Sequence, residues 1–165
     1  MTKSLAHWER LDPMTTPLWN FAELVTASGG TADGTPEMAI TGFTFDTRAL
    51  EPGNVFVALK DQRDGHDFVT AAFGAGAALA IVSESYQRKP GDGALIRVAD
   101  PLKALENIGI ARRVQVEPHA KVIAVTGSAG KTGTKEMLRA CLNNVAPGRV
   151  HASEKSYNNH WGVPL

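Results

Sequence analysis

The sequence contains a single cysteine, Cys141, among its 165 residues. One cysteine excludes an internal disulfide and any metal site built on a cysteine cluster. Since Cys141 falls at an apolar position of helical spacing, we expect it to be an inert core residue in a reducing compartment. No apolar run is long enough to span a membrane, and the polar N-terminus, with Glu9 and Asp12, does not read as a signal peptide. We therefore expect a cytoplasmic protein with no membrane partner.

The sequence also has no excess charge, because 17 basic residues balance 17 acidic ones. A neutral chain does not favour a surface that coats a polyanion, so nucleic acid is not an expected partner. Hydrophobic residues make up 43% of the chain and charged residues 21%, which places it among ordinary globular proteins rather than disordered ones. The chain is also long enough to bury a core.

The most informative stretch is KVIAVTGSAGKTGTKEMLRACL, residues 121–142. Val122 to Val125 is a short apolar run, typical of a strand buried in a parallel sheet. Gly127 and Gly130 follow, and helical spacing of apolar residues begins after them. A strand, a loop with two glycines, Lys-Thr and a helix, in this order, indicate a phosphate-binding loop.

The residue types of this loop suit a bound polyphosphate. Several backbone N–H groups must point at one spot, and glycines permit the tight turn that this requires. The helix that begins near Lys131 adds unpaired N–H groups and the positive end of its dipole. Lys131 is the candidate catalytic residue because it can reach the β- and γ-phosphates of ATP, and the Thr132 hydroxyl can ligate Mg²⁺. The predicted ATP-binding residues are Thr126, Gly127, Ser128, Ala129, Gly130, Lys131, Thr132 and Gly133.

The loop departs from the general pattern G-x-x-x-x-G-K-[ST], whose first glycine would fall at Val125. The alternative interpretation is a turn with glycines between a strand and a helix, as in any α/β protein. The Gly-Lys-Thr sequence at the start of the helix argues against that alternative.

The remaining pattern predicts an α/β fold with two domains. We expect helices at 18–27, 68–77 and 101–116, and strands at 40–46, 54–59, 78–82, 94–98 and 150–153. Residues 31–37 are expected to form a loop. Glu117-Pro118-His119 breaks the last of these helices and marks the domain boundary. The prediction is a mixed α/β domain over residues 1–117, with a flexible arm at 1–17, followed by the start of a P-loop-type parallel α/β domain over 118–165.

Two polar clusters follow expected strands. In Asp46-Thr47-Arg48, the Arg48 guanidinium and the Thr47 hydroxyl could meet phosphate oxygens at the carboxyl end of a strand, where α/β sheets bind ligands. Asp64-Gly65-His66 lies in the loop after residues 54–59. Taken alone, the first cluster could be a solvated strand end, and the second an ordinary tight turn with His66 bonded locally. A single histidine among carboxylates is not a metal site without further ligands.

Taken together, these motifs resemble the Mur ligases, the ATP-dependent amide-bond-forming enzymes of peptidoglycan precursor synthesis. The form T-G-x-x-G-K-T at residues 126–132 resembles the ATP loop of the family. The strings F-D-T-R, P-G-N-V-F-V-A-L, D-G-H-D-F and G-A-A, between Phe45 and Ala78, resemble the N-terminal UDP-binding domain of members that act on the longer UDP-muramoyl-peptides. Gly133 stands where the family often has a second hydroxyl, which leaves Thr132 as the loop hydroxyl for Mg²⁺.

The resemblance implies site residues, cofactors and substrates. It places contacts to the UDP-substrate at Thr47, Arg48, Asp64, Gly65, His66, Asn158 and Asn159. The two asparagines belong to Asn-Asn-x-x-Gly-Val-Pro, which resembles a segment of the ligase that adds D-alanyl-D-alanine to UDP-N-acetylmuramoyl-tripeptide; a polar turn is the alternative. The implied cofactors are ATP and Mg²⁺, the implied substrates are these two molecules, and the reaction passes through an acyl phosphate. We expect a monomer.

The family has three domains, and this chain stops soon after the second begins. We therefore expect an N-terminal fragment that does not turn over by itself. Three other interpretations stay open: the ligase that adds a diamino acid to UDP-N-acetylmuramoyl-dipeptide, a non-catalytic module that binds a UDP-sugar, and a generic P-loop kinase. Asn158-Asn159 disfavours the first of these.

Overall fold

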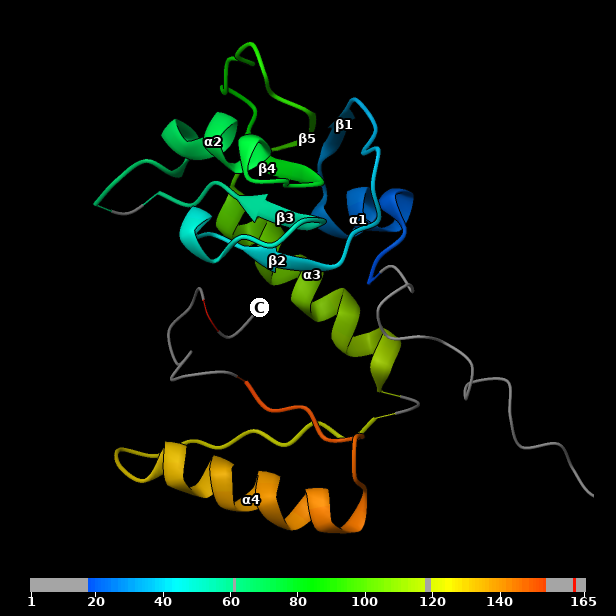
Figure 1. Cartoon of the computed structure of the whole chain (residues 1–165), viewed down its shortest axis with the longest axis vertical. Coiled ribbons are helices and arrows are strands. Elements are labelled where there is room, and N and C mark those ends of the chain that lie inside the picture. Colours follow the sequence, from blue (N-terminus) through cyan, green and yellow to red (C-terminus); the bar gives the residue numbers. More distant parts are fainter. Residues whose placement is uncertain (1–17, 61, 118–119, 154–161, 163–165) are drawn as a thin grey trace, which may run out of the picture. The chain divides into compact units, whose positions relative to one another are not determined.

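The computed structural model describes residues 18–60, 62–117, 120–153 and 162. The chain divides into two units, the first ending at Ala111 and the second beginning at Arg112. Figure 1 labels the helices and strands of both units. None of the helices in the described ranges combines the length and apolar character that crossing a membrane requires.

The first unit is built on a five-stranded sheet with the strand order β1-β5-β4-β3-β2. The strands are β1 (Thr31–Asp33), β2 (Gly42–Thr44), β3 (Asn54–Val57), β4 (Leu79–Ser83) and β5 (Ala94–Val98). Strands β2 to β5 run parallel, with Val55 opposite Leu79 in the register of β3 and β4. Strand β1 pairs antiparallel with β5, so that Asp33 lies opposite Leu95. The sheet is therefore parallel except for one edge strand.

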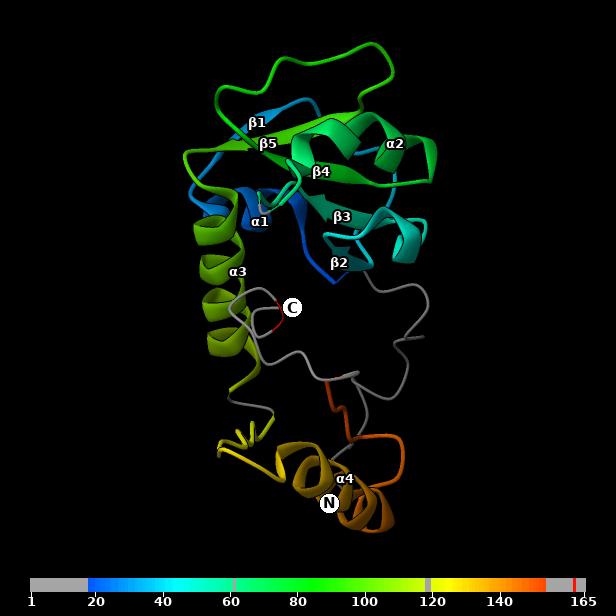
Figure 2. The same ribbon diagram turned by 90° about the vertical axis from the view of Figure 1, so that its left-hand side faces the viewer.

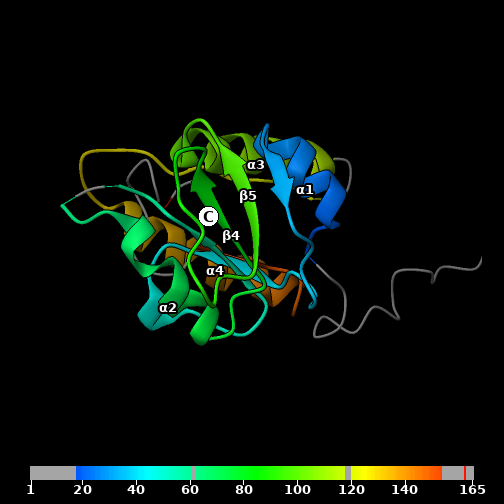
Figure 3. The same cartoon turned by 90° about the horizontal axis from the view of Figure 1, so that it is seen from above.

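Helices cover both faces of this sheet. They are α1 (Phe21–Ser28), α2 (Val69–Gly74) and α3 (Pro101–Val116), together with two short 3₁₀ helices, Thr47–Ala49 and Gly65–Phe68. Figures 2 and 3 show α1 and α3 on one face and α2 on the other. Helix α1 begins where the Asn20 side chain accepts a bond of 3.0 Å from the Ala22 N–H, and it ends at Gly29, whose φ of 69° is left-handed.

The core lies between the central strands and these helices. All four residues of β3 are buried, and so are Leu79 to Val82 of β4, which explains the continuous apolar runs at residues 55–59 and 77–82. Phe56 is 1% exposed and packs in a cluster with Val69 and Ala72 of α2. Burying a side chain of this size stabilises a fold by about 1.5 to 3 kcal/mol. The first unit thus has a core of its own.

The predicted α/β class is confirmed, and most elements of the first unit lie where the sequence places them. The expected helix at 18–27 starts three residues later, at Phe21, because Asn20 supplies the cap. The prediction of a loop over 31–37 is wrong at its start, since Thr31–Asp33 forms the antiparallel edge strand β1. Three residues, two of them exposed and one half-buried, give too short a pattern to predict a strand.

The second unit contains helix α4 (Lys131–Val145), none of whose residues is buried. The predicted strands at 122–125 and 150–153 are wrong, because the described residues 120–153 form no strand there. Val122 and Ile123 are 55% and 56% exposed, and a parallel strand needs neighbours to bond with. Cys141, expected in a core, is exposed on α4. The assignment of domains to 1–117 and 118–165 stays a prediction.

Candidate functional site

The two polar clusters of the first unit lie at the same edge of its sheet. Because β2, β3 and β4 are parallel neighbours, the segments that follow them leave at their shared carboxyl edge. Asp46-Thr47-Arg48 follows β2, and Asp64-Gly65-His66 follows β3. This is the edge at which open α/β sheets bind ligands.

The first cluster presents a cation to solvent. Asp46 caps the 3₁₀ helix by accepting a bond of 3.0 Å from the Arg48 N–H. It also holds the Arg48 guanidinium in a bidentate pair, with Nε 2.9 Å from Oδ1 and Nη2 2.7 Å from Oδ2. The bond to Asp46, together with its charge, raises the pKa of Arg48. The pair with Asp46 preorganises the guanidinium. Because the Arg48 side chain is 88% exposed, the guanidinium is also open to an anionic ligand. Thr47, half-buried, is the first residue of the same 3₁₀ helix.

The second cluster is bonded internally. Asp64 Oδ1 accepts from the His66 N–H at 3.0 Å and lies 2.6 Å from His66 Nδ1. The Ser83 N–H donates to His66 Nε2 at 2.9 Å, so that nitrogen carries a lone pair and the proton sits on Nδ1. The bond from the His66 backbone, and then that from its ring, lower the pKa of Asp64. Both ring nitrogens are therefore engaged.

Gly65 lets this loop fold back on the end of β3. Its N–H donates to the Leu59 carbonyl oxygen at 2.8 Å. A Cβ at this position would lie 2.5 Å from the same oxygen and 2.8 Å from the Leu59 nitrogen, closer than real Cβ atoms approach. Lys60, whose side chain is 78% exposed, lies with its Nζ 3.8 Å from Asp64 Oδ2. The predicted trio thus shapes the loop, while Lys60 provides its exposed charge.

A third polar centre, at Asp92, is not among the site residues that the sequence predicts. The Asp92 carboxylate accepts bonds from Thr70 Oγ1 at 2.7 Å, from the Tyr86 hydroxyl at 2.7 Å and from the Lys89 N–H at 2.8 Å. Burial, with the bond to Asp92, raises the pKa of Tyr86 to about 12. Although burial opposes it, the three donated bonds lower the pKa of Asp92. The Tyr86 ring centroid lies 5.6 Å from that of His66, which connects this centre to the Asp64 loop.

The predicted phosphate loop of the second unit is a tight turn in front of a helix. Gly127 and Gly130 have φ values of 146° and 79°, a region that favours glycine. Gly130 is the N-cap of α4, and Lys131 is its first residue. The Lys131 ammonium donates to the Gly127 carbonyl oxygen, across the turn. Because α4 has 15 residues, its exposed N-terminus offers aligned N–H donors to an anion.

The other loop residues lie on this turn or in the first turn of the helix. Thr126, Ser128, Ala129, Thr132 and Gly133 are all exposed. In the described part of the chain, no group of three or more His, Cys, Asp or Glu residues could hold a metal ion. The role of the Thr132 hydroxyl as a Mg²⁺ ligand stays a prediction. Asn158 and Asn159 lie outside the described residues.

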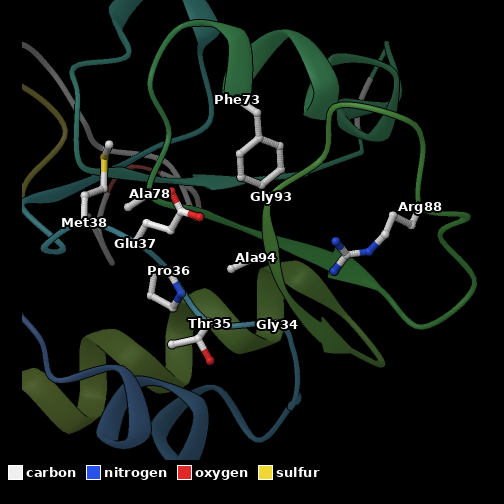
Figure 4. Close-up of a pocket in the computed structure, with 10 residues that line it drawn as sticks. All are labelled: Gly34, Thr35, Pro36, Glu37, Met38, Phe73, Ala78, Arg88, Gly93 and Ala94. Atoms are coloured by element: carbon white, nitrogen blue, oxygen red, sulfur yellow. The ribbon is translucent and has the colours of Figure 1, made fainter.

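A cavity of about 290 Å³ lies at the opposite, amino edge of the sheet, beside the starts of β4 and β5 (Figure 4). None of the predicted site residues lines it. Arg88, on its wall, is already held by Asp33, whose carbonyl and carboxylate oxygens lie 2.7 Å and 2.9 Å from Nη2. The lining residues are Gly34, Thr35, Pro36, Glu37, Met38, Phe73, Ala78, Arg88, Gly93 and Ala94. The cavity is therefore separate from the polar clusters described above.

Comparisons with known proteins bear on both units. Residues 125–165 match the sequence profile of the Mur ligase middle domain. The UDP-N-acetylmuramoyl-tripeptide–D-alanyl-D-alanine ligase of Bacillus subtilis is 41% identical over 148 residues, covering 88% of this chain and 31% of the relative. The ligase of the same name from Escherichia coli is 38% identical over 130 residues, covering 78% and 27%.

Solved structures give the same picture. MurF from Acinetobacter baumannii superposes with a TM-score of 0.73 at 38% identity, over 88% of this chain and 32% of that protein. The MurF ligase from Thermotoga maritima, in complex with ADP, gives a TM-score of 0.52 at 30% identity, over 74% and 27%. The chain thus spans about a third of the length of the relatives that it matches.

Proposed function

Because this chain belongs to the Mur ligase family, we propose that it takes part in the ATP-dependent joining of UDP-N-acetylmuramoyl-tripeptide to D-alanyl-D-alanine. Relatives named for this substrate pair, at 41% and 38% identity, support the proposal. About two thirds of the length of those relatives has no counterpart in this chain, so the reaction is proposed for the ligase as a whole. The cytoplasmic location and the monomeric state stay predictions.

The observation that carries the proposal is the turn between Gly127 and Gly130. A left-handed glycine caps an exposed helix of 15 residues, and a lysine follows it directly. Such an arrangement directs backbone N–H groups, the helix dipole and one ammonium toward the same place, which suits the terminal phosphates of ATP. We assign ATP to this loop, and the complex of the relative from Thermotoga maritima with ADP supports binding of an adenine nucleotide.

The carboxyl edge of the first unit is proposed to bind the UDP-substrate. Arg48 is the contact best supported by geometry, because its guanidinium is exposed yet fixed by Asp46. A planar guanidinium pairs with two phosphate oxygens at once, as the diphosphate of a nucleotide sugar offers. The Thr47 hydroxyl, one residue earlier, adds a donor on the same 3₁₀ helix.

The two sites would act together in the first of two steps, because the phosphoryl donor and its acceptor must both be bound. The γ-phosphoryl group of ATP passes to the terminal carboxylate of the tripeptide, and ADP leaves. The amine of D-alanyl-D-alanine then attacks the acyl phosphate, which forms the amide bond and releases phosphate. Lys131 would stabilise the negative charge on the transferred group, and Thr132 is the residue that would hold Mg²⁺. Mg²⁺, when bound, supplies further neutralisation of the phosphate charge.

Titration calorimetry with ATP and Mg²⁺ tests the loop assignment. We expect Lys131→Ala to weaken ATP binding about 10- to 100-fold, since a charge-assisted bond to phosphate is lost. The matched control is Lys135→Ala, which removes the same charge one helical turn later, where Lys135 bonds the Ser153 carbonyl oxygen. Equal ATP affinity in the Lys131→Ala variant and the unmodified chain would refute the assignment. Binding of the UDP-substrate without any ATP binding would favour the non-catalytic module instead.

A further inference from the structure

His66 joins two segments that are far apart in the sequence. Through Nδ1 it holds Asp64, the cap of the 3₁₀ helix Gly65–Phe68, and through Nε2 it accepts the N–H of Ser83, at the end of β4. The His66 side chain is only 17% exposed, and its ring lies beside that of Tyr86. The loop after β3 is therefore tied to the neighbouring strand by one imidazole.

We propose that His66 is a positioning residue, which fixes residues 62–68 of the loop after β3 at the carboxyl edge and makes no contact with the UDP-substrate itself. The proposal rests on the proposed function, because this loop and the segment that carries Arg48 follow neighbouring parallel strands at the same edge of the sheet. It differs from the prediction made from the sequence, where His66 is a direct contact.

The bonding of the ring supports this role. A neutral imidazole has one donor and one acceptor, and Asp64 and Ser83 occupy both. A substrate atom could bond to the ring only by displacing one of these partners. Displacing Ser83 would leave a half-buried backbone N–H without an acceptor, and displacing Asp64 would break the 2.6 Å contact between its carboxylate and the ring. The same two bonds fix which way the loop faces.

The His66 clamp, that is, the ring with its bonds to Asp64 and Ser83, would hold in place the exposed charge of Lys60. Lys60 lies at the start of the loop, with its ammonium near Asp64 and its side chain 78% exposed. Since Asp64 is held by the His66 ring, the position of the Lys60 charge depends on His66 indirectly, through Asp64. A cation on the segment after β3 and another, Arg48, on the segment after the neighbouring strand β2 suit an anionic ligand with two phosphate groups.

The ring nitrogens of His66 give the most direct test. Long-range ¹H–¹⁵N spectra of the whole chain at neutral pH should show a proton on Nδ1 and none on Nε2. Saturation with UDP-N-acetylmuramoyl-tripeptide should leave both ring nitrogens unshifted, while the side-chain resonance of Arg48 Nε moves. A proton on Nε2 in the free chain would refute the clamp, and a ring shift on saturation would restore the direct contact.

The two proposals can fail separately. If no resonance of residues 18–111 responded to the nucleotide sugar, the proposal for the UDP-substrate would be wrong, together with the role of His66 in placing that site. The clamp itself would still be decided by the tautomer in the free chain, and by the hydrogen exchange of the Ser83 amide, which should be at least tenfold faster in the His66→Ala variant.

Substitutions distinguish positioning from a general structural role. We expect His66→Ala to weaken binding of UDP-N-acetylmuramoyl-tripeptide about tenfold. His66→Gln, whose amide oxygen can still accept from Ser83, should recover part of the loss. The matched control is Asp33→Asn on the edge strand β1, which weakens the ion pairs of Asp33 with Arg88 and Arg97. This variant should leave the affinity unchanged. Unchanged affinity in His66→Ala, or an equal loss in the control, would contradict the positioning role.

Discussion

The two units of the chain differ in how their predicted sites are held. In the first unit, Arg48 and Asp64 follow neighbouring strands of a sheet whose central strands are buried. In the second, the predicted ATP loop from Thr126 to Thr132 runs into the first turn of α4, a helix with no buried residue. A site assembled from several strands depends on tertiary packing, whereas a glycine turn at a helix start depends on local backbone geometry. Stability and ligand binding should therefore be separable in this chain.

The largest loss of stability should follow the removal of a large core side chain from the first unit. Phe56 on β3 is 1% exposed, so Phe56→Ala should lower the free energy of unfolding of the first unit by about 3 to 5 kcal/mol. Urea unfolding, followed by the fluorescence of Trp19, which is buried in the same unit, measures this loss.

The matched substitution in the second unit is Leu142→Ala on α4. Leu142 is 38% exposed, so its truncation should change the free energy of unfolding by no more than about 0.5 kcal/mol. Comparable losses for Phe56→Ala and Leu142→Ala would mean that the two units do not differ as described.

An intermediate effect is expected at alkaline pH, again in the first unit. The pKa of Tyr86 is raised from 10.0 to about 12 by burial and by the bond to Asp92. A raised folded-state pKa contributes stability that is complete below pH 10 and is lost as the pH rises toward 12. We expect this loss to be about 1 to 2 kcal/mol, because solvent at the loop screens part of the full effect.

The measurement for Tyr86 is a difference between two proteins. The free energy of unfolding of the unmodified chain and of Tyr86→Phe should be compared from pH 8 to pH 11.5. Lysines titrate in both proteins, so their contribution cancels. The advantage of the unmodified chain over the variant should shrink as the pH rises, and a constant difference would contradict the assignment.

The smallest effect concerns Asp33 on the edge strand β1. Bonds from Arg97, and the charge of Arg88, lower the pKa of Asp33 although burial opposes them. A lowered folded-state pKa gives stability that is complete above the ordinary value of 3.8 and is lost as the pH falls below it. Asp33→Asn should therefore lose less stability between pH 5 and pH 3 than the unmodified chain does. Equal acid sensitivity of the two proteins in urea unfolding would show that the cluster adds nothing.

The sequence predicts the buried part of the fold well, for a physical reason. Strand segments buried on both faces, such as residues 55–57 of β3 and 79–82 of β4, are apolar along their length and so are visible locally. Helix α3 begins at a proline after a capping Asp100, and its bounds match the prediction of 101–116. Strand β1 is missed because its stability comes from partners far along the chain, among them Arg97, which is 64 residues from Asp33.

The sites are predictable in position but only partly in role. The glycine turn at 127–130 and the cation at Arg48 follow from local residue types. The role of His66 does not, because its bond to Ser83, 17 residues away, is set by the crossover between β3 and β4. The strand expected at 122–125 shows the opposite error, since an apolar run specifies a strand only where neighbouring strands are available.

The central claim is that the chain carries two separate sites, one for the UDP-substrate and one for ATP. The most direct test is crossed titration calorimetry, in which UDP-N-acetylmuramoyl-tripeptide and ATP with Mg²⁺ are each titrated into Arg48→Ala and Lys131→Ala. We expect Arg48→Ala to weaken only the nucleotide-sugar affinity, and Lys131→Ala only the ATP affinity, each by about tenfold or more. Loss of both affinities in either variant, or of neither in both, would contradict the account.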